Sequence, residues 1–281
     1  MTEILNGRVL ARTIRQKAAD RISHLSQPPG LAVILVGDNS ASSLYVKLKE
    51  EAAREVGIYV ERINLPGDIA TEDLIDKIKT LNLRQDIHGI LVQLPLTTQD
   101  TDAVINAIHP TKDVDGFHKE NRRALLDNSP VLVPPVALSI MRLIQATRRP
   151  IRGAHAVIVG NSEIFAEPLI ELLREAEVEG SFVQKNAPNI NALTREADIV
   201  IIAAGTPGIV TKDAIQEGAI VIDVGTNKAA NGKVVGDAHP NIDGWAGFVS
   251  PVPGGVGPLT VAYLLMNVIK AQEVQARHLE A

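Results

Sequence analysis

The stretch "VIVGNSEIFAEPLIELL", residues 157–173, has the pattern of a buried strand, a short turn and an amphipathic helix. A strand that passes into a helix at a glycine, here Gly160, is the outline of a turn that binds a nucleotide phosphate. A dinucleotide-binding turn usually carries three glycines at fixed spacing. This turn has only Gly160, and bulky or charged residues (Ile164, Phe165 and Glu167) stand where the second and third glycines are expected. The rest of the chain therefore has to indicate whether the turn binds a dinucleotide.

Helix and strand patterns alternate along the whole chain. Continuous apolar runs such as "GLAVILVG" are typical of parallel strands buried on both faces, and amphipathic segments with capping residues lie between them. This alternation predicts βαβ units and an α/β fold with a mainly parallel sheet. The expected strands are 30–37, 59–66, 87–96, 154–160, 198–205, 219–225 and 247–252, and the expected helices include 40–57, 71–82, 212–217 and 259–278.

A proline-rich segment around residues 130–150 separates two αβ series. We therefore expect a domain boundary near residue 135 and two α/β domains with a cleft between them. The first domain is predicted to comprise residues 1–135, with a C-terminal helix (259–281) that returns to it. The second domain, residues 136–258, is predicted to be Rossmann-like.

Composition excludes several classes of protein. The net charge of −5 gives no basic surface for nucleic acid, and the absence of cysteine excludes disulfides and thiolate metal sites. The seven histidines form no i, i+3 or i, i+4 pair, so no metal site is predicted. The N-terminus lacks the apolar segment of a signal peptide, and no apolar run approaches the roughly 18 residues of a membrane span. We expect a cytoplasmic protein without membrane or nucleic-acid partners.

Polar residues in the first half indicate chemistry. Tyr45 and Lys49 are four residues apart on a predicted helix, so they share one face. They are candidates for a proton-transfer pair; the alternative is that the spacing occurs by chance. Gln93 lies near the carboxyl end of a predicted strand, where open α/β sheets bind ligands; the alternative is a solvated strand-end side chain. Asp113 and Asp115 lie in "HPTKDVDGFH". In one interpretation an aspartate side chain closes an Asx turn. In the other, a carboxylate of this pair binds a heterocycle through two hydrogen bonds.

The order of four motifs carries more information than any one of them. The Tyr45–Lys49 pair is followed by "GILVQLPL" (89–96), then "KDVDGF" (112–117), then "SPVPGGVGPLTVA" (250–262). In this order, over nearly the full length, the chain resembles the bifunctional methylenetetrahydrofolate dehydrogenase/cyclohydrolase family. The closing stretch is the most specific of these signatures.

The resemblance implies a role for each matched residue. Lys49 corresponds to the catalytic lysine, Tyr45 to a tyrosine that lines the folate pocket, Gln93 to a glutamine that hydrogen-bonds the lysine, and Asp115 to an aspartate that binds the pterin ring. The glycine-rich loop is expected to place its backbone against the flat substrate, because glycine leaves room for close approach. The further implied substrate contacts are Val92, Leu94, Pro253, Gly254, Gly255, Val256 and Gly257.

The resemblance also implies two reactions in one-carbon metabolism. They are the NADP-dependent oxidation of 5,10-methylenetetrahydrofolate to 5,10-methenyltetrahydrofolate, and hydrolysis of that product to 10-formyltetrahydrofolate. In the hydrolysis, water attacks the cationic methenyl bridge, and a lysine beside it can orient the water and accept its proton. Family members are usually homodimers that associate through the second domain.

The nucleotide turn departs from the family pattern Gly-Arg-Ser-x-x-Val-Gly-x-Pro. We expect Glu167 to add a negative charge in the first helical turn, where a phosphate would otherwise bind. The residues at 134–137, 183–187 and 223–227 also differ from the family pattern, whereas the folate-side residues match it. The turn keeps Gly160, Ser162 and Pro168, and it carries Asn161, Phe165 and Ala166 in place of arginine, valine and the second glycine.

These departures lead to a prediction for the cofactor. Lys185 lies about 25 residues after Gly160, where an NAD enzyme carries an acid, so a 2′-phosphate and NADP are favoured; the alternative is a solvent-exposed lysine. We expect weak or absent dinucleotide binding. One alternative function is a monofunctional cyclohydrolase with a degenerate nucleotide site. Another is a catalytically silent folate- or partner-binding protein, which intact Lys49 and Gln93 disfavour. The predicted cofactor contacts are Gly160, Asn161, Ser162, Lys185 and Thr226.

Overall fold

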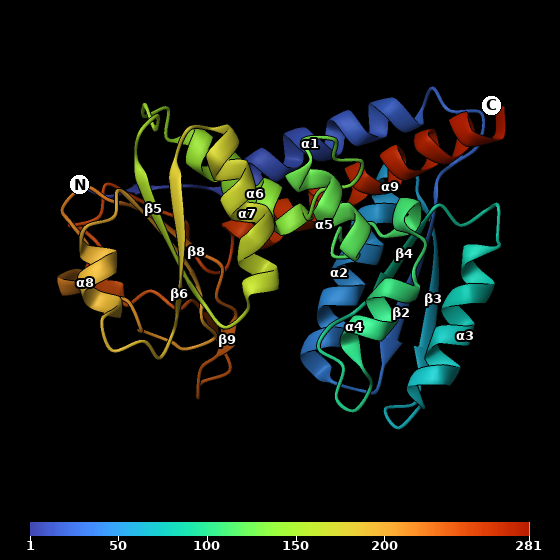
Figure 1. Cartoon of the computed structure of the whole chain (residues 1–281), viewed down its shortest axis with the longest axis horizontal. Helices are drawn as coiled ribbons and strands as arrows, with labels where there is room; N and C mark the ends of the chain where they lie inside the picture. Colours follow the sequence, from blue (N-terminus) through green and yellow to red (C-terminus); the bar gives the residue numbers. More distant parts are fainter. Residues whose placement is uncertain (281) are drawn as a thin grey trace. The chain divides into compact units, whose positions relative to one another are not determined.

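A computed structural model describes residues 1–280 and divides the chain into two compact α/β units (Figure 1). The three-stranded unit comprises Arg12–Pro135 and the chain from Val261 onward. The six-stranded unit comprises Met1–Ala11 and Val136–Thr260. The first eleven residues thus belong with the second half of the chain, whereas the sequence division placed them in the first domain. The cause is β1 (Glu3–Ile4), which pairs in parallel with β11 and is too short to give a strand pattern.

The sheet of the three-stranded unit has the order β3-β2-β4, and its strands are parallel. The central strand is buried on both faces. Leu31, Val33 and Leu35 pack with α1, α2 and α9, whereas Ala32 and Ile34 pack with α3 and α4. The elements are α1 (Gly7–Ile22), β2 (Gly30–Val36), α2 (Ser40–Val56), β3 (Tyr59–Leu65), α3 (Thr71–Asn82), β4 (Gly89–Val92), α4 (Thr101–Ala107), η1 (Pro110–Lys112), α5 (Lys119–Leu126) and α9 (Val256–Glu280).

The sheet of the six-stranded unit has the order β1-β11-β8-β7-β5-β6, and every neighbouring pair is parallel. A separate hairpin, β9–β10, is antiparallel. The elements are α6 (Pro135–Ala146), β5 (His155–Gly160), α7 (Glu163–Glu175), β6 (Glu179–Gln184), α8 (Ile190–Arg195), β7 (Ile199–Ala203), η2 (Lys212–Ala214), β8 (Ile220–Asp223), β9 (Asn227–Lys228), β10 (Val234–Val235), η3 (Pro240–Ile242) and β11 (Phe248–Val249).

Helices cover both faces of this sheet (Figure 1). On one face Val157, Val200 and Val221 pack with side chains from η2, η3 and the start of α8. On the other face α7 crosses β6 so closely that a Cβ atom on Gly180 would lie 3.2 Å from Leu173. A parallel sheet that is buried on both faces confirms the predicted α/β class.

Most predicted elements are present, and the differences have local causes. β4 ends at Val92 because Pro95 has no N–H to continue the ladder. The segment predicted as a helix at 212–217 is the short 3₁₀ turn η2. β6, "EGSFVQ", was not among the predicted strands because glutamate, glycine and serine have low strand propensity. The last helix begins at Val256, three residues before the predicted start, so its first turn contains the last residues of the glycine-rich motif.

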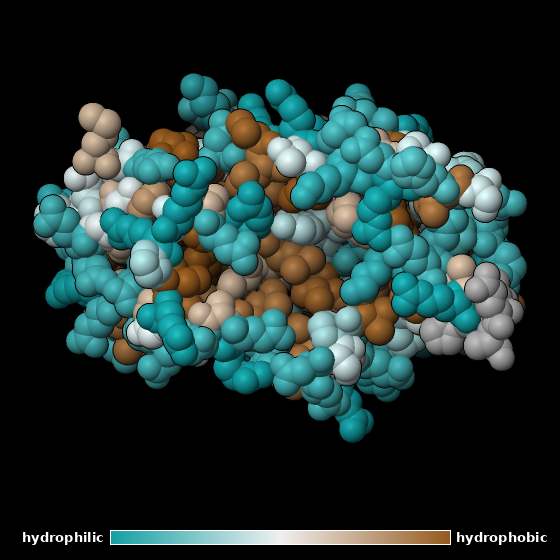
Figure 2. Space-filling view, turned by 90° about the horizontal axis from the view of Figure 1, so that it is seen from above, coloured by the Kyte–Doolittle hydropathy of each residue, from teal (hydrophilic) through white to brown (hydrophobic). Residues whose placement is uncertain are grey.

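On the face shown in Figure 2 hydrophilic residues predominate, with apolar residues exposed between them. Large exposed apolar residues include Leu44 and Leu48, one turn apart on α2. Among the helices described here, none combines the length and the apolar character that crossing a membrane requires.

Candidate active site

Helix α2 positions the first pair of candidate residues. The side chain of Asn39 accepts a hydrogen bond from the N–H of Ser42 in the first turn (3.1 Å). Val46 and Ala53 bury the core-facing side of the helix. Tyr45 and Lys49 lie at the edge of that buried side, and both are half-buried. Packing of the apolar face therefore sets the direction in which the phenol and the ammonium project.

Gln93 connects Lys49 to the end of β4. Lys49 Nζ donates to Gln93 Oε1 at 3.1 Å, and Gln93 Nε2 donates to the carbonyl of Leu94 at 2.7 Å. The backbone N–H of Gln93 donates to Ile34 O of the central strand. Because the amide group is held at its nitrogen end, its oxygen faces the ammonium. Lys49 is thus fixed by a neutral acceptor rather than by a carboxylate.

The two aspartates of the turn after η1 have different environments. Asp113 is buried and accepts hydrogen bonds from Gly116 N, His118 N and Asn121 Nδ2 at 2.7–3.1 Å. Burial raises the pKa of Asp113 to about 6, although these three donors favour the charged form. Asp113 therefore makes the Asx turn that holds the loop.

Asp115, two residues later, is partly accessible, and within residues 1–280 its carboxylate has no hydrogen-bond partner. Protein atoms surround the group, and this desolvation raises its pKa; the charge of Lys49 acts in the opposite direction. An accessible carboxylate without a partner in the chain can accept hydrogen bonds from a ligand. The loop depends on Gly116, which has φ +73° and whose Cβ would lie 2.7 Å from Pro134 N.

The two residues that flank Gln93 differ in what they can offer a ligand. Val92 is buried in the apolar cluster beneath α3 and α4, so a substrate contact there would have to use its main chain. Leu94 is half-buried and gives its carbonyl to Gln93. The peptide bond between Leu94 and Pro95 is cis.

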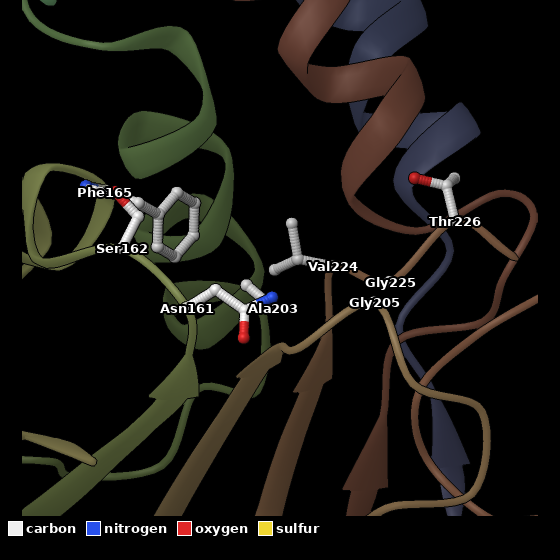
Figure 3. A pocket seen from close by; sticks show the side chains of 8 residues that line it. All are labelled: Asn161, Ser162, Phe165, Ala203, Gly205, Val224, Gly225 and Thr226. Carbon is white, nitrogen blue, oxygen red and sulfur yellow. Dashed lines mark hydrogen bonds between the residues drawn. The ribbon is translucent and has the colours of Figure 1, made fainter. Parts of the chain in front are cut away.

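The six-stranded unit contains a pocket of about 330 Å³ at the carboxyl ends of β5, β7 and β8 (Figure 3). This is the position at which open parallel sheets bind nucleotides. Figure 3 shows the ring of Phe165 pointing into the pocket from the first turn of α7. The lining residues are Asn161, Ser162, Phe165, Ala203, Gly205, Val224, Gly225 and Thr226.

The start of α7 differs in one respect from the expectation. Ser162 caps the helix by accepting a hydrogen bond from Phe165 N (3.3 Å), so the first helical residue is Glu163. Glu167 is therefore the fifth helical residue. It lies beyond the first turn, whereas we had expected it within that turn. The carboxylate that does lie in the first turn is that of Glu163. The expectation of a negative charge close to the helix N-terminus is met by a different residue.

Asn161 and Lys185 meet at one carbonyl. Asn161 Nδ2 donates to Ala204 O at 2.9 Å, and Lys185 Nζ donates to the same oxygen at 3.1 Å and to Thr206 Oγ1 at 3.2 Å. Lys185 is half-buried at the end of β6, so it is not the exposed lysine of the alternative reading. Its ammonium is held beside the loop after β7.

Sequence reasoning missed five of the eight residues that line the pocket. Phe165 had been noted only as a departure from the family pattern, and Ala203, Gly205, Val224 and Gly225 were not proposed as contacts. The available signal was the position of the last four, because each lies among the final three residues of a predicted parallel strand. Gly160, by contrast, ends β5 and is not among the lining residues.

The loop of Pro253–Gly257 belongs to the six-stranded unit. For two of its glycines, the backbone conformation or the packing of the chain itself explains why a larger residue would not fit. Gly254 has φ +117°, and a Cβ on Gly255 would lie 2.8 Å from Pro251 O. Gly257 has no atom within 4 Å of an added Cβ, so no neighbour in the chain requires glycine there. The peptide bond before Pro253 is cis.

Among the described residues, no three histidine, aspartate or glutamate side chains come together in an arrangement suited to a metal ion.

A parallel α/β unit with a pocket at its strand ends, joined to a unit with an ordered lysine–glutamine pair, defines the class of a dinucleotide-dependent enzyme with a separate catalytic unit. Two family profiles match the chain. The tetrahydrofolate dehydrogenase/cyclohydrolase catalytic domain matches residues 5–115, and the NAD(P)-binding domain of the same family matches residues 134–276. The chain belongs to the tetrahydrofolate dehydrogenase/cyclohydrolase family, which confirms the prediction from its motifs.

Individual relatives agree with this assignment. The bifunctional protein FolD of Lysinibacillus sphaericus is 41% identical over 275 residues, which cover 96% of this chain and 97% of the relative. The crystal structure of the bifunctional FolD enzyme from Campylobacter jejuni has a TM-score of 0.93 at 37% identity and covers 98% of this chain and 100% of that one. A Trypanosoma brucei FolD complexed with NADP cofactor and inhibitor has a TM-score of 0.92 at 32% identity, with 98% and 99% covered.

Proposed function

We propose that the protein catalyses both reactions of its family, as a cytoplasmic homodimer. The first is NADP-dependent oxidation of 5,10-methylenetetrahydrofolate, and the second is hydrolysis of 5,10-methenyltetrahydrofolate to 10-formyltetrahydrofolate. The observation that carries the proposal is the hydrogen bond between Lys49 and Gln93, in the same unit as an Asp115 carboxylate without a partner in the chain.

Lys49 is the proton acceptor in the hydrolysis. Water attacks the cationic methenyl carbon, a C–O bond forms, and one water proton passes to Lys49 Nζ. The remaining hydroxyl proton then moves to the leaving nitrogen as one C–N bond breaks, which gives the formyl product. The reaction needs the amine lone pair aimed at the water. Gln93 fixes the lysine through a neutral acceptor, and the carboxylate of Asp115 interacts with the same ammonium through its charge.

Asp115 holds the pterin ring. A carboxylate can accept two parallel hydrogen bonds from an amino group and a neighbouring ring N–H. Asp113 cannot take this role because its oxygens already accept bonds from Gly116, His118 and Asn121. Tyr45, one turn before Lys49 on α2, provides an aromatic face for the substrate.

The pocket of the six-stranded unit lies where open parallel sheets bind dinucleotides. Ser162, Asn161 and Thr226 offer polar groups at the strand ends, and Lys185 offers a cation suited to a 2′-phosphate. When bound, NADP accepts the hydride from the methylene carbon. No acid stands at the Lys185 position to bind an unmodified ribose, which favours NADP over NAD.

We propose further that the oxidation is slower than the hydrolysis. Asn161 carries no charge where family members usually have arginine, and the loss of a charged hydrogen bond costs roughly 1.5–3 kcal/mol. Glu163 places a like charge in the first turn of α7, which costs roughly 0.3–1 kcal/mol more. Together these terms weaken dinucleotide binding by roughly one to three orders of magnitude.

The second candidate is a monofunctional cyclohydrolase. It is favoured by the confinement of the family departures to the nucleotide side, while Lys49, Gln93 and Asp115 are unchanged. Two spectroscopic assays separate the candidates: decay of methenyltetrahydrofolate absorbance, and methylene-dependent reduction of NADP⁺ and of NAD⁺. Hydrolysis with slow NADP⁺ reduction supports the bifunctional enzyme, and hydrolysis with no reduction supports the monofunctional one. Absence of both activities would favour the silent binding protein.

The homodimer is proposed to form through the six-stranded unit. In the described sheet β6 is an edge strand, with β5 on one side only. An open edge is a surface that a second copy can cover. Light scattering over a range of concentrations checks this proposal, and a monomer at micromolar concentration would contradict it.

A further inference from the structure

Two buried carboxylates lie at the strand ends that carry the pocket. Asp223 ends β8 and Asp237 follows β10, and they are 4% and 0% exposed. The side-chain hydrogen bonds of Asp237 connect it to the loop after β7 and to Asn227 at the start of β9. Its Oδ2 accepts from Ala204 N (2.7 Å) and Gly205 N (2.9 Å), and its Oδ1 accepts from Thr206 N (2.8 Å) and Asn227 Nδ2 (2.8 Å).

Three successive N–H groups that converge on one anion form a backbone nest. Here the anion is the carboxylate of Asp237. It fixes the peptide planes of residues 204–206 and so determines where their carbonyl and hydroxyl oxygens point.

Asp223 in turn fixes the segment that carries Asp237. Its Oδ1 accepts from Asp237 N (3.0 Å) and Gly225 N (2.9 Å), and its Oδ2 accepts from Ala238 N (2.8 Å). The packing leaves no space for adjustment, since an added Cβ on Gly225 would lie 2.4 Å from Asp237 Cγ. One on Gly236 would lie 1.9 Å from Asp223 Oδ2. The two loops that carry pocket residues Gly205, Val224, Gly225 and Thr226 are thereby held together.

The loop that Asp237 fixes also accepts hydrogen bonds from two of the side chains proposed to bind the cofactor. Ala204 O accepts from Asn161 Nδ2 and from Lys185 Nζ, and Thr206 Oγ1 lies 3.2 Å from Lys185 Nζ. One hydrogen bond separates Asp237 from residue 204, and one more separates residue 204 from Asn161 or Lys185.

We infer that Asp237 is a positioning residue of the cofactor site, which sets the places of Asn161 and Lys185 through the loop 204–206. The inference rests on the proposed dehydrogenase function. It makes a specific claim about selectivity, because Lys185 is the group proposed to distinguish NADP from NAD. Loss of the Asp237 contacts displaces Lys185 and lowers NADP affinity more than NAD affinity.

The test is calorimetric titration of the full-length protein with NADP⁺ and NAD⁺. In Asp237→Asn one carboxylate oxygen becomes an NH₂ group that faces two N–H donors, so two hydrogen bonds are lost. We expect NADP⁺ affinity to fall about tenfold or more, with a smaller loss for NAD⁺. Hydrolysis of preformed methenyltetrahydrofolate is expected to stay within about twofold of wild type. Asp243→Asn, an exposed aspartate of the same unit, is the matched control.

A second variant decides the matter if Asp237→Asn does not fold. Thr206→Val removes the hydroxyl beside Lys185 and keeps the N–H that Asp237 binds. NADP⁺ affinity is expected to fall about threefold, with NAD⁺ affinity unchanged.

The possible results separate the two proposals. Wild-type protein that binds neither dinucleotide overturns the proposed dehydrogenase function and the inference with it. Wild-type protein that binds NADP⁺, with unchanged selectivity in both variants, overturns the inference alone. An equal loss of NADP⁺ and NAD⁺ affinity in both variants also overturns it, because a merely structural residue would give that result.

Discussion

The two units use their polar groups in opposite ways. In the three-stranded unit the Asp115 carboxylate has no hydrogen-bond partner within residues 1–280, and Lys49 donates to one neutral acceptor. In the six-stranded unit Asp237 accepts four hydrogen bonds, and Asn161 and Lys185 both donate to a loop carbonyl. The first arrangement leaves hydrogen-bonding capacity for a ligand. The second uses most of that capacity to build the walls of the pocket.

This difference parallels the pattern in the sequence. The residues that match the family's folate side are those with capacity left for a ligand. The positions that depart from the family lie around the nucleotide turn, where Asn161 makes an internal bond in place of an arginine's charge. A short amide can satisfy the loop but cannot neutralise a phosphate. The contrast therefore predicts strong effects of mutation on the folate side and graded effects on the nucleotide side.

The largest effect is expected at Lys49. Lys49→Ala removes the proposed proton acceptor, and the hydrolysis rate should fall by roughly two to four orders of magnitude, the usual contribution of general base catalysis. The absorbance decay of methenyltetrahydrofolate measures it. Lys47→Ala is the matched control, since Lys47 is exposed on the same helix and forms an ion pair with Glu51. Near wild-type hydrolysis by Lys49→Ala would remove the lysine from the mechanism.

The next effect concerns pH and Asp113. Its pKa is about 6 in the folded protein against 3.8 for the free group, so the folded state binds the proton more tightly. The stabilisation is complete below pH 4 and is lost as the pH rises through 6, by about 3 kcal/mol in total. Urea unfolding between pH 4 and 7 should therefore show wild type losing stability relative to Asp113→Asn. The exposed Asp102→Asn serves as control, and parallel curves for wild type and Asp113→Asn would contradict the assignment.

Asp115 should behave differently from Asp113, although they are two residues apart. Asp115→Ala removes the proposed pterin acceptor, and folate affinity should fall by roughly 1.5–3 kcal/mol, the value of a charged hydrogen-bonded contact. Stability should change little, because the carboxylate holds no part of the described chain. Calorimetry with a folate analogue and urea unfolding measure the two quantities. Unchanged folate affinity together with lost stability would reverse the roles given to the two aspartates.

The sequence predicted the fold well where periodicity was strong. The helix predicted at 71–82 is α3 with the same bounds, because its apolar residues recur at helical spacing between clear ends. β1 was not predicted, since two residues carry no period and the strand exists only through pairing with β11, some 240 residues later in the chain. Propensity and pattern describe local preference, and such a pairing is a property of the folded chain.

The candidate site was predictable in part for the same reason. Lys49 and Tyr45 could be placed on one helix face from spacing alone. The different roles of Asp113 and Asp115 could not, because which carboxylate turns inward depends on donors from His118 and Asn121. The contacts of Asp237 with residues 204–206 cross more than thirty residues of sequence, and no motif marks them. The first-turn charge was assigned to Glu167 because the cap at Ser162 was not recognised.

The smallest expected effect restores the missing charge. Asn161→Arg adds a guanidinium at the pocket entrance while giving up the bond to Ala204 O, so a gain in phosphate binding is offset by a looser loop. One charged hydrogen bond gained and one neutral bond lost gives a net improvement of about 1 kcal/mol, or roughly fivefold tighter NADP⁺ binding. Hydrolysis should not change. Asn186→Arg, which adds the same charge at an exposed position after β6, controls for general electrostatic attraction. If both variants gain equally, the effect is long-range attraction. If Asn161→Arg binds no better than wild type, the nucleotide turn is already adapted to its cofactor, and the contrast between the two units does not extend to function.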